Sequence, residues 1–153
     1  MPVPVRQASV ADIPAILRTE RAAKSAAHWM PHEYERLIKT GLVLLREEDG
    51  ALEGFVAVRE IACEWEIENI VVGEAFQRRG VADELMRALL RHAGEQAAEA
   101  IWLEVRKSNQ AARALYEKHG FLQTGKRSRY YKDPEEDAIL YTFHFRKDAE
   151  GSV

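Results

Sequence analysis

A short stretch from Gln77 to Ala82 combines small residues with positive charge, between a β-like run and a helix-like run. Gly80 and Ala82 let the backbone approach a ligand closely. A helix that begins there directs unpaired N–H groups and its positive dipole end at an anion, and Arg78 and Arg79 add charge of the right sign. The stretch has neither the Lys-Ser or Lys-Thr ending of the common nucleotide loop nor a three-glycine dinucleotide fingerprint. It predicts a pyrophosphate-binding loop, with close packing of a strand-to-helix turn as the alternative.

Glu104 is a second residue of interest, because it interrupts the nearly continuous apolar run from Ile101 to Val105. Such a run is typical of a central strand that is buried on both faces. A carboxylate in this setting needs a function or a partner, and the structural alternative is an ion pair with Arg106 or another cation. The apolar neighbours favour a pKa above the ordinary value of about 4.3 for this carboxyl group.

Acidic side chains also line one face of a predicted strand from Glu64 to Val72. Alternation along a strand puts Glu64, Glu66 and Glu68 on the same face. Together they can form an acidic wall that attracts a cationic amine, or one of them can act as a base.

The elements that position these residues are predicted from hydrophobic periodicity and from cap residues. Helices are expected from Ser9 or Asp12 through Leu17, from Pro31 to Gly41, over Val81 to Ala98, and from Ser108 or Asn109 to Gly120. Strands are expected over Val3 to Gln7, Leu42 to Arg46, Leu52 to Val58, Glu64 to Val72 and Ile101 to Val105, from Phe121 onward, and over Ile139 to Phe145. This order of strands and helices predicts a mixed α/β fold.

The composition indicates one compact domain, since the chain has 153 residues, of which 46% are hydrophobic and 31% charged. We expect this domain to span residues 1–147 and residues 148–153 to be a disordered tail. The formal net charge of -3 argues against a nucleic-acid-binding domain, which usually carries a basic excess. No segment has the length of a membrane span and the N-terminus lacks the apolar core of a signal peptide, so we expect a cytoplasmic protein without membrane binding.

Cysteine and histidine usage predicts neither a disulfide nor a metal site. Cys63 is the only cysteine, which excludes an internal disulfide and fits a reducing compartment. The five histidines show no metal-ligand spacing, so we expect no metal ion.

Several linked motifs resemble the GNAT acyltransferase superfamily, and within it the RimI-type ribosomal-protein alanine N-acetyltransferases. The matching segments are Ile67 to Val72, the loop Gln77 to Ala82 with its Q/R-x-x-G-x-G/A signature, Trp102 to Arg106, Ser108-Asn109, Ala112, Leu115-Tyr116, Gly120-Phe121, Gly125, Arg127, Tyr130-Tyr131 and Glu136 to Ala138. The resemblance implies the GNAT fold, a mixed and mostly antiparallel sheet with a parallel β-α-β crossover and flanking helices.

The resemblance also implies which residues would bind acetyl-CoA. Backbone groups of Ile70, Val71 and Val72 would hold the pantetheine arm and the acetyl carbonyl, and Asn109 would contact the cofactor. The loop residues that would wrap the pyrophosphate are Gln77, Arg78, Arg79, Gly80, Val81, Ala82 and Asp83.

For catalysis, the resemblance implies Glu104 as the general base and Tyr116 as the general acid, in one ternary complex without a covalent enzyme intermediate. The alternative for Tyr116 is a packed aromatic residue on the helix face of Ala112. Glu66 and Glu68 are rival bases, since other GNAT branches use a carboxylate from the preceding strand.

The resemblance gives less information on the residues that would bind the acceptor. Trp29 matches the Trp of a Phe-x-x-Pro-Trp-Ser/Thr stretch in the RimI-type members, although the preceding Phe and Pro are missing here. Tyr130 and Tyr131 would line a peptide groove, or they are ordinary strand aromatics. Glu66 and Glu68 would face the acceptor amine.

The expected function is therefore transfer of an acetyl group from acetyl-CoA to the α-amino group of a protein N-terminus, with a ribosomal protein that begins with alanine as one candidate acceptor. One alternative is a GNAT that acetylates a lysine side chain or a small amine. Another is a CoA-binding regulatory module without turnover, although such a module has no need of an acid and a base. The sequence indicates no oligomeric state and no acyl-chain preference.

Overall fold

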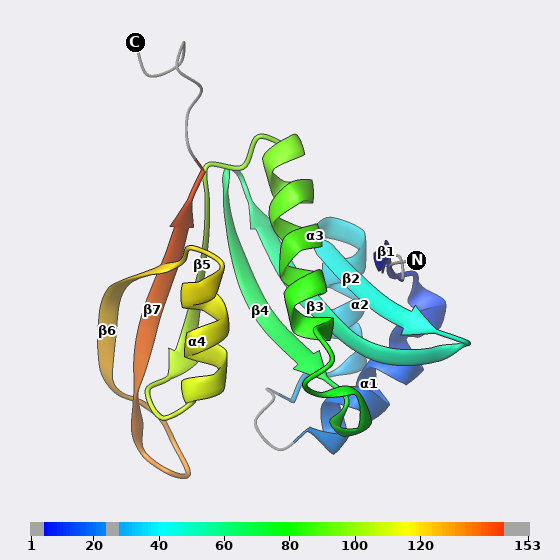
Figure 1. Cartoon of the computed structure of the whole chain (residues 1–153), viewed down its shortest axis with the longest axis horizontal. Helices are drawn as coiled ribbons and strands as arrows, with labels where there is room; N and C mark the ends of the chain where they lie inside the picture. The colour runs from blue at the N-terminus through cyan, green and yellow to red at the C-terminus, as the bar shows by residue number, and fades with distance from the viewer. Residues whose placement is uncertain (1–4, 24–27, 146–153) are drawn as a thin grey trace. The chain divides into compact units, whose positions relative to one another are not determined.

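The computed structural model of the chain describes residues 5–23 and 28–145. The described residues form a mixed α/β fold with a seven-stranded sheet in the order β1-β2-β3-β4-β5-β7-β6, flanked by helices (Figure 1). The pair β4–β5 is parallel, and β1–β2, β2–β3, β5–β7 and β6–β7 are antiparallel. The predicted fold class is thereby confirmed. Predictions for Val3, for Ala26-Ala27 and for the tail 148–153 lie outside the described residues.

Contacts divide the chain into two units. The described residues within Met1–Glu60 and Ile67–His92 form the first unit, and those within Ile61–Glu66 and Ala93–Val153 form the second. The expectation of one domain over residues 1–147 stays a prediction.

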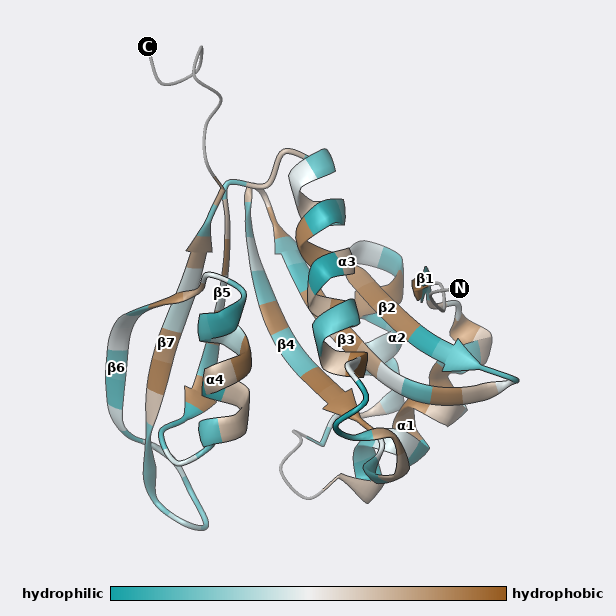
Figure 2. Ribbon diagram, viewed as in Figure 1, coloured by the Kyte–Doolittle hydropathy of each residue, from teal (hydrophilic) through white to brown (hydrophobic). Residues whose placement is uncertain are grey.

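Most of the helices belong to the first unit. In chain order its elements are β1 (Val5–Gln7), η1 (Val10–Asp12), α1 (Ile13–Ala22), α2 (Pro31–Thr40), β2 (Leu42–Glu48), most of β3 (Ala51–Ile61), most of β4 (Glu64–Val72), η2 (Glu74–Phe76) and most of α3 (Val81–Glu95). Figure 1 shows α1 and α2 on one face of these strands and α3 on the other. Figure 2 shows apolar and hydrophilic stripes along α3, as expected for a helix that covers a sheet with one side.

The core of the first unit lies between the helix pair α1–α2 and the sheet. Its buried members are Ile13, Ile16, Leu17, Tyr34, Leu37, Val43, Leu45, Phe55, Ala57 and Val71. Residues on β4 alternate between buried and partly exposed, with Trp65, Ile67, Asn69 and Val71 inward. The predicted division of this strand into two faces is therefore confirmed, and its bounds match the prediction.

The second unit contains β5 (Ala100–Arg106), α4 (Gln110–Lys118), β6 (Leu122–Tyr131) and β7 (Glu136–His144), besides the first residues of β4. Those first residues pair with β5 in parallel, with Glu66 opposite Trp102. The antiparallel register places Glu104 of β5 opposite Leu140 of β7, and Arg127 of β6 opposite Ala138 of β7. Strand β7 thus lies between β5 and β6 in the sheet.

Helix α3 ends at Glu95, so the prediction that it reaches Ala98 is wrong. Ala97 has a φ of 60°, in the left-handed region, and the N–H of Ala98 donates to the carbonyl of Ala93 at 3.0 Å. This is the hydrogen bond of a helix C-terminal cap. Glycine usually occupies the left-handed cap position, and because alanine stands there the sequence carries no stop signal.

Candidate functional site

The backbone predicted to hold the cofactor, Ile70 to Val72, forms the end of β4 in the first unit. The neighbouring β3 approaches it closely at Gly54, where a Cβ atom would lie 2.8 Å from the Val71 carbonyl oxygen and 3.0 Å from Val81 Cγ1. A side chain at position 54 would therefore push against this part of β4.

The loop after β4 is held by hydrogen bonds to its neighbours. The N–H of Gly73 donates to the carbonyl of Glu53 at 2.8 Å. The amide nitrogen of the Gln77 side chain donates to the carbonyl of Val72 at 3.4 Å. Gly80 has a φ of 80°, a conformation that favours glycine, and a Cβ atom there would meet none of the described residues within 4 Å. The glycine is thus required by the backbone turn, and the close packing that was the alternative interpretation is not found at Gly80 among the described residues.

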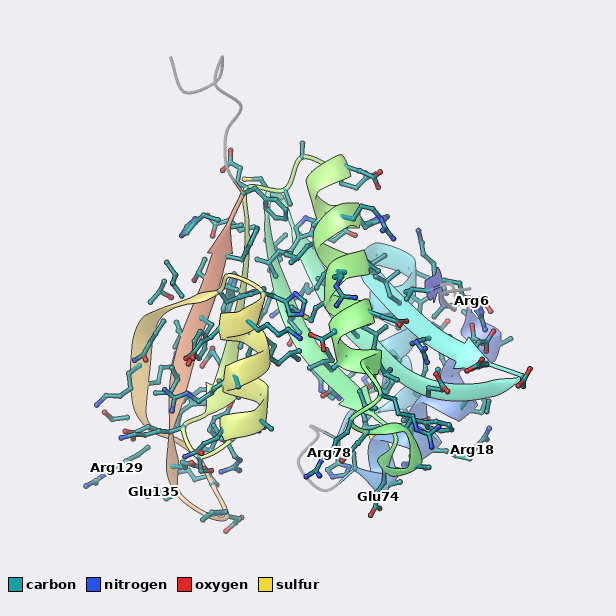
Figure 3. The ribbon with its side chains drawn as sticks, in the orientation of Figure 1. Arg6, Arg18, Glu74, Arg78, Arg129 and Glu135 are labelled. Carbon is teal, nitrogen blue, oxygen red and sulfur yellow. The ribbon has the colours of Figure 1, made fainter. Side chains whose placement is uncertain are left out.

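Two exposed arginines of this loop precede the start of α3. Arg78 and Arg79 are exposed, and the guanidinium carbon of Arg79 lies 6.0 Å from the centre of the Phe76 ring. Figure 3 shows Arg78 projecting from the loop. The first N–H groups of an α-helix have no acceptor within the helix, so Val81 and the next residues offer donors to an anion. The arrangement suits a diphosphate.

Two acidic residues, Asp83 and Glu84, lie in the first turn of α3 and oppose an anion there. Arg46 of β2 offsets the charge of Glu84, with its Nε atom 2.5 Å from Glu84 Oε2. The same guanidinium forms an ion pair with the buried Glu53. This network joins β2, β3 and the first turn of α3, and it was not predicted from the sequence.

The segment between α1 and α2 contains Trp29, which was predicted to bind the acceptor. Its backbone N–H donates to Glu20 Oε1 at 3.0 Å. The other carboxylate oxygen of Glu20, which is buried, accepts a hydrogen bond from the Tyr34 hydroxyl, and Asn69 of β4 donates to that hydroxyl at 3.2 Å. Trp29 is therefore tied through α1 and α2 to the strand that leads to Ile70. Sequence reasoning missed this network, since a lone glutamate in a helical pattern indicates an exposed residue.

The acidic residues of β4 have different surroundings. Glu68, in the first unit, pairs with Arg59 Nε at 2.9 Å, and its side chain is 12% exposed. Glu66, in the second unit, is partly buried, and its charge acts on Glu104. Glu68, one of the two rival candidates for the base, is thus already paired with the guanidinium of Arg59.

Glu104 lies on β5, and its side chain is 12% exposed. Its Oε2 atom is buried and accepts no hydrogen bond from any residue that the structure describes. The Nε atom of Arg127 lies 3.4 Å from Oε2. Burial raises the pKa of the Glu104 carboxyl group; the charge of Arg127 opposes this rise and the charge of Glu66 adds to it. A carboxylate with a raised pKa is a stronger base than an exposed glutamate.

Arg106, the other cation considered for Glu104, has different partners. It donates to the carbonyls of Pro134 and Lys132 at 3.0 and 2.9 Å, and it pairs with Glu136. The sequence left open whether Glu104 pairs with Arg106 or with another cation. In the structure it pairs with another cation, Arg127. That cation comes from β6, separated from β5 by β7, and no local pattern in the sequence predicts such a distant contact.

Tyr116 is buried on α4, where its ring packs against Phe121 and Tyr141 at centroid distances of 5.8 and 6.2 Å. Burial raises the pKa of its hydroxyl, with a smaller contribution from the charge of Tyr131. The phenol therefore keeps its proton through the neutral range. The packed-aromatic interpretation is correct for the ring, and a catalytic role of the hydroxyl stays a prediction.

Tyr131 is a shared electrostatic neighbour of both catalytic candidates. Burial, followed by the charge of Glu104, raises the pKa of the Tyr131 hydroxyl to about 12. Arg106 lies over its ring at 4.5 Å, and the exposed ring of Tyr130 meets it edge-on at 5.1 Å. The second unit thus brings together Glu66, Glu104 and Tyr131 with Arg127, a residue to which sequence analysis gave no role.

Asn109 begins α4 as its N-cap, with its side-chain oxygen accepting from the N–H of Ala112 at 3.2 Å. The preceding Ser108 N–H donates to Glu136 Oε2 at 2.5 Å. The predicted cap is thereby confirmed, and the amide nitrogen of Asn109 is the part of its side chain suited to a cofactor contact.

Neither metal clusters nor membrane spans are found in the described parts of the chain. Over residues 5–23 and 28–145, no three His, Cys, Asp or Glu side chains gather in a way that could hold a metal ion. In the same ranges, no helix is long and apolar enough to cross a membrane.

Comparison with known proteins gives a family match over most of the chain. Residues 12–121 match the model of the acetyltransferase (GNAT) family. The [ribosomal protein bS18]-alanine N-acetyltransferase of Escherichia coli (strain K12) is 32% identical over 135 residues, which cover 84% of this chain and 88% of that protein.

Solved structures show the same likeness. The crystal structure of the ribosomal-protein-S18-alanine N-acetyltransferase from Escherichia coli superposes with a TM-score of 0.83 at 28% identity, covering 95% of this chain and 97% of the other. Ard1 from Thermoplasma volcanium superposes with a TM-score of 0.85 at 26% identity, covering 94% and 98%.

Proposed function

The chain belongs to the acetyltransferase (GNAT) family and is an acetyl-CoA-dependent N-acetyltransferase, and on that premise we propose that its acceptor is the α-amino group of a protein N-terminus. A ribosomal protein that begins with alanine is the proposed physiological acceptor. The Escherichia coli relative, which is 32% identical in sequence, is named for acetylation of alanine on a ribosomal protein. Such an acceptor would place the reaction in the cytoplasm.

The cofactor-binding part of the proposal rests on the loop before α3. Gly80 and the start of the helix would direct backbone N–H groups at the pyrophosphate of acetyl-CoA, and Arg78 and Arg79 would supply positive charge for it. The end of β4, from Ile70 to Val72, would hold the pantetheine arm through its backbone groups.

The observation that supports an amine as the acceptor is the buried Oε2 atom of Glu104, which accepts no hydrogen bond from any residue in the described part of the chain. A buried carboxylate oxygen normally has a donor, and leaving it without one costs free energy. An ammonium group or a water that relays its proton would satisfy this oxygen. The raised pKa of Glu104 then makes proton removal easier.

The proposed reaction is direct attack in a ternary complex. Glu104, directly or through water, removes one proton from the ammonium group, and the amine nitrogen attacks the acetyl carbonyl carbon. The C–N bond forms and the C–S bond breaks. Tyr116 gives its proton to the departing thiolate, the second proton of the nitrogen returns to the tyrosine, and Glu104 releases its proton to solvent.

The acidity of the amine favours an N-terminus over a lysine. An α-amino group has a pKa of about 7.7 to 8.0, whereas a lysine side chain has a pKa of about 10.4. Each unit of difference costs about 1.4 kcal/mol when the proton moves to the same carboxylate. Burial and Glu66 raise the pKa of the Glu104 base, and the charge of Arg127 opposes this rise. Such a base suits the α-ammonium group, which is a stronger acid than the ammonium group of lysine.

The proposal is tested by measuring acetyl transfer from acetyl-CoA to a peptide that begins with alanine. We expect Glu104→Gln to lower kcat by about 10²- to 10⁴-fold, the usual contribution of a general base. Tyr116→Phe should have a smaller effect, because burial makes its phenol a weak acid. Acetyl-CoA binding, measured by calorimetry, should stay unchanged in both variants.

Two outcomes would contradict this account. Wild-type protein that binds acetyl-CoA but acetylates no peptide would indicate a binding module. Equal rates in wild type and both variants would remove Glu104 and Tyr116 from catalysis.

A further inference from the structure

Arg127 joins the catalytic and the acceptor-binding candidates of the second unit. Its Nε atom lies 3.4 Å from Glu104 Oε2, and its guanidinium carbon lies 5.1 Å from the centre of the Tyr130 ring. The Arg127 side chain is 53% exposed, whereas that of Glu104 is 12% exposed. A solvent-accessible cation thus reaches a buried carboxylate from the direction of an exposed aromatic ring.

The contact between Arg127 and Glu104 is an ion pair without a hydrogen bond, since Oε2 accepts none within the described ranges. Ion pairs of this length on a half-exposed arginine are weak and exchange readily. A cation that reaches hydrogen-bond distance of Oε2 would bind there more strongly than the guanidinium does.

We propose that Arg127 is a tethered counter-ion of Glu104, which keeps the carboxylate ionised in the free enzyme and gives up its place to the ammonium group of the acceptor. This inference rests on the proposed function and adds a positioning residue to it. The displaced guanidinium would remain on the Tyr130 ring, where a cation–π contact stabilises it. A cationic acceptor would thereby replace one positive charge with another beside the carboxylate.

The other groups around Glu104 set the direction of the effect. Glu66 of β4 carries a like charge, and Tyr131 of β6 is a protonated phenol. On β5 itself, Trp102 and Arg106 share the face of Glu104, and the guanidinium of Arg106 lies over the Tyr131 ring and pairs with Glu136. Burial and Glu66 both raise the pKa of Glu104, and Arg127 lowers it. Without the arginine the carboxyl group would therefore bind its proton at a higher pH.

The test is the pH dependence of kcat/KM for an alanine-initiated peptide, whose acid limb reports the ionisation of the base. We expect Arg127→Gln to move this limb upward by about 0.5 to 1 pH unit. This is below the effect of about 1 to 3 units that an adjacent arginine can have, because Arg127 is half exposed. Arg127→Lys keeps the charge and should restore most of the wild-type profile.

Arg129→Gln is the matched control. Arg129 belongs to the same strand, is 81% exposed and pairs with Glu135 at 3.5 Å, so its removal changes the net charge equally. Figure 3 shows Arg129 and Glu135 together at one end of the β6–β7 hairpin. We expect the Arg129→Gln profile to coincide with that of wild type.

A profile of Arg127→Gln that coincides with wild type would overturn the proposal, and so would an equal shift in Arg129→Gln. The titration of the Glu104 carboxyl carbon by NMR, assigned with Glu104→Gln, provides a readout that needs no turnover. If the protein acetylated no peptide, the proposed function would fail, while the carboxyl titration would still show whether Arg127 is the counter-ion.

Discussion

The main cost of the proposed site lies in a single residue, Glu104. Its side chain is 12% exposed, its Oε2 atom is buried, and that atom accepts no hydrogen bond from its ion-pair partner Arg127 or from any other described residue. Desolvation therefore penalises the charged form, which is the form a general base needs. Proteins commonly retain such destabilising groups where chemistry requires them.

Glu104→Gln should make the protein more stable at neutral pH while it removes activity. A carboxyl group with a raised pKa contributes its full stability below the unfolded-state pKa, and that contribution is lost as the pH rises through the folded-state pKa. The neutral amide of the glutamine variant does not titrate, so its contribution to stability stays the same as the pH rises. We therefore expect the Tm of the variant to exceed that of wild type at pH 8, with the difference shrinking toward pH 4, as measured by calorimetry.

Glu136→Gln is the control of opposite sign. The hydrogen bond from Ser108 lowers the pKa of the Glu136 carboxyl group, with Arg106 adding to the effect. Its charged form is thus favoured by folding, and its amide variant should have a lower Tm at pH 8. An unchanged or lower Tm for Glu104→Gln at pH 8 would contradict the assignment of a desolvated carboxylate.

At the scale of elements, the predicted cofactor-binding backbone depends on close packing between strands. Gly54 of β3 leaves room for the carbonyl of Val71, and the N–H of Gly73 is held by the carbonyl of Glu53. The ion pairs of Arg46 then connect this strand to the first turn of α3. The loop is therefore supported by β2 and β3 as well as by its own glycine.

Gly54→Ala should weaken acetyl-CoA binding although no predicted contact residue is substituted. Its Cβ atom would lie 2.8 Å from the Val71 carbonyl oxygen, so β4 has to shift. We expect a stability loss of about 1 to 3 kcal/mol from overpacking, together with a raised KM for acetyl-CoA. Steady-state kinetics and thermal denaturation measure the two effects.

Gly50→Ala provides a variant with strain but no clash. Gly50 lies in the β2–β3 turn with a φ of 77°, and a Cβ atom there has no neighbour within 4 Å in the part of the chain that the structure describes. The left-handed backbone should cost alanine about 1 to 2 kcal/mol. If both variants raised the KM for acetyl-CoA equally, general destabilisation would explain the result and the role of β4 packing would be refuted.

The sequence predicted elements well where the signal was local. Alternation gave the bounds and faces of β4, and Asn109 gave the start of α4. Helix α3 was predicted too long because Ala97, and not a glycine, adopts the left-handed cap. The partners of buried charges, Arg127 for Glu104 and Tyr34 for Glu20, depend on tertiary contacts between distant segments. Periodicity and capping rules do not report such contacts.

At the scale of the whole molecule, the proposed tasks are divided between the two units. The loop Gln77 to Ala82 and the end of β4 belong to the first unit, and Glu104 with Tyr116 belongs to the second. The net charge of -3 gives no general attraction for an anionic cofactor, so Arg78 and Arg79 have to supply it locally. Cofactor affinity and proton transfer should therefore respond to different substitutions.

The central claim, acetylation of an α-amino group, is tested most directly with one peptide that carries both a free N-terminal alanine and an internal lysine. Wild-type protein and acetyl-CoA are added, and tandem mass spectrometry locates the acetyl group. The account predicts acetylation of the N-terminal alanine, with loss of the reaction when that N-terminus is chemically blocked. Acetylation of the lysine at an undiminished rate in the blocked peptide would contradict it.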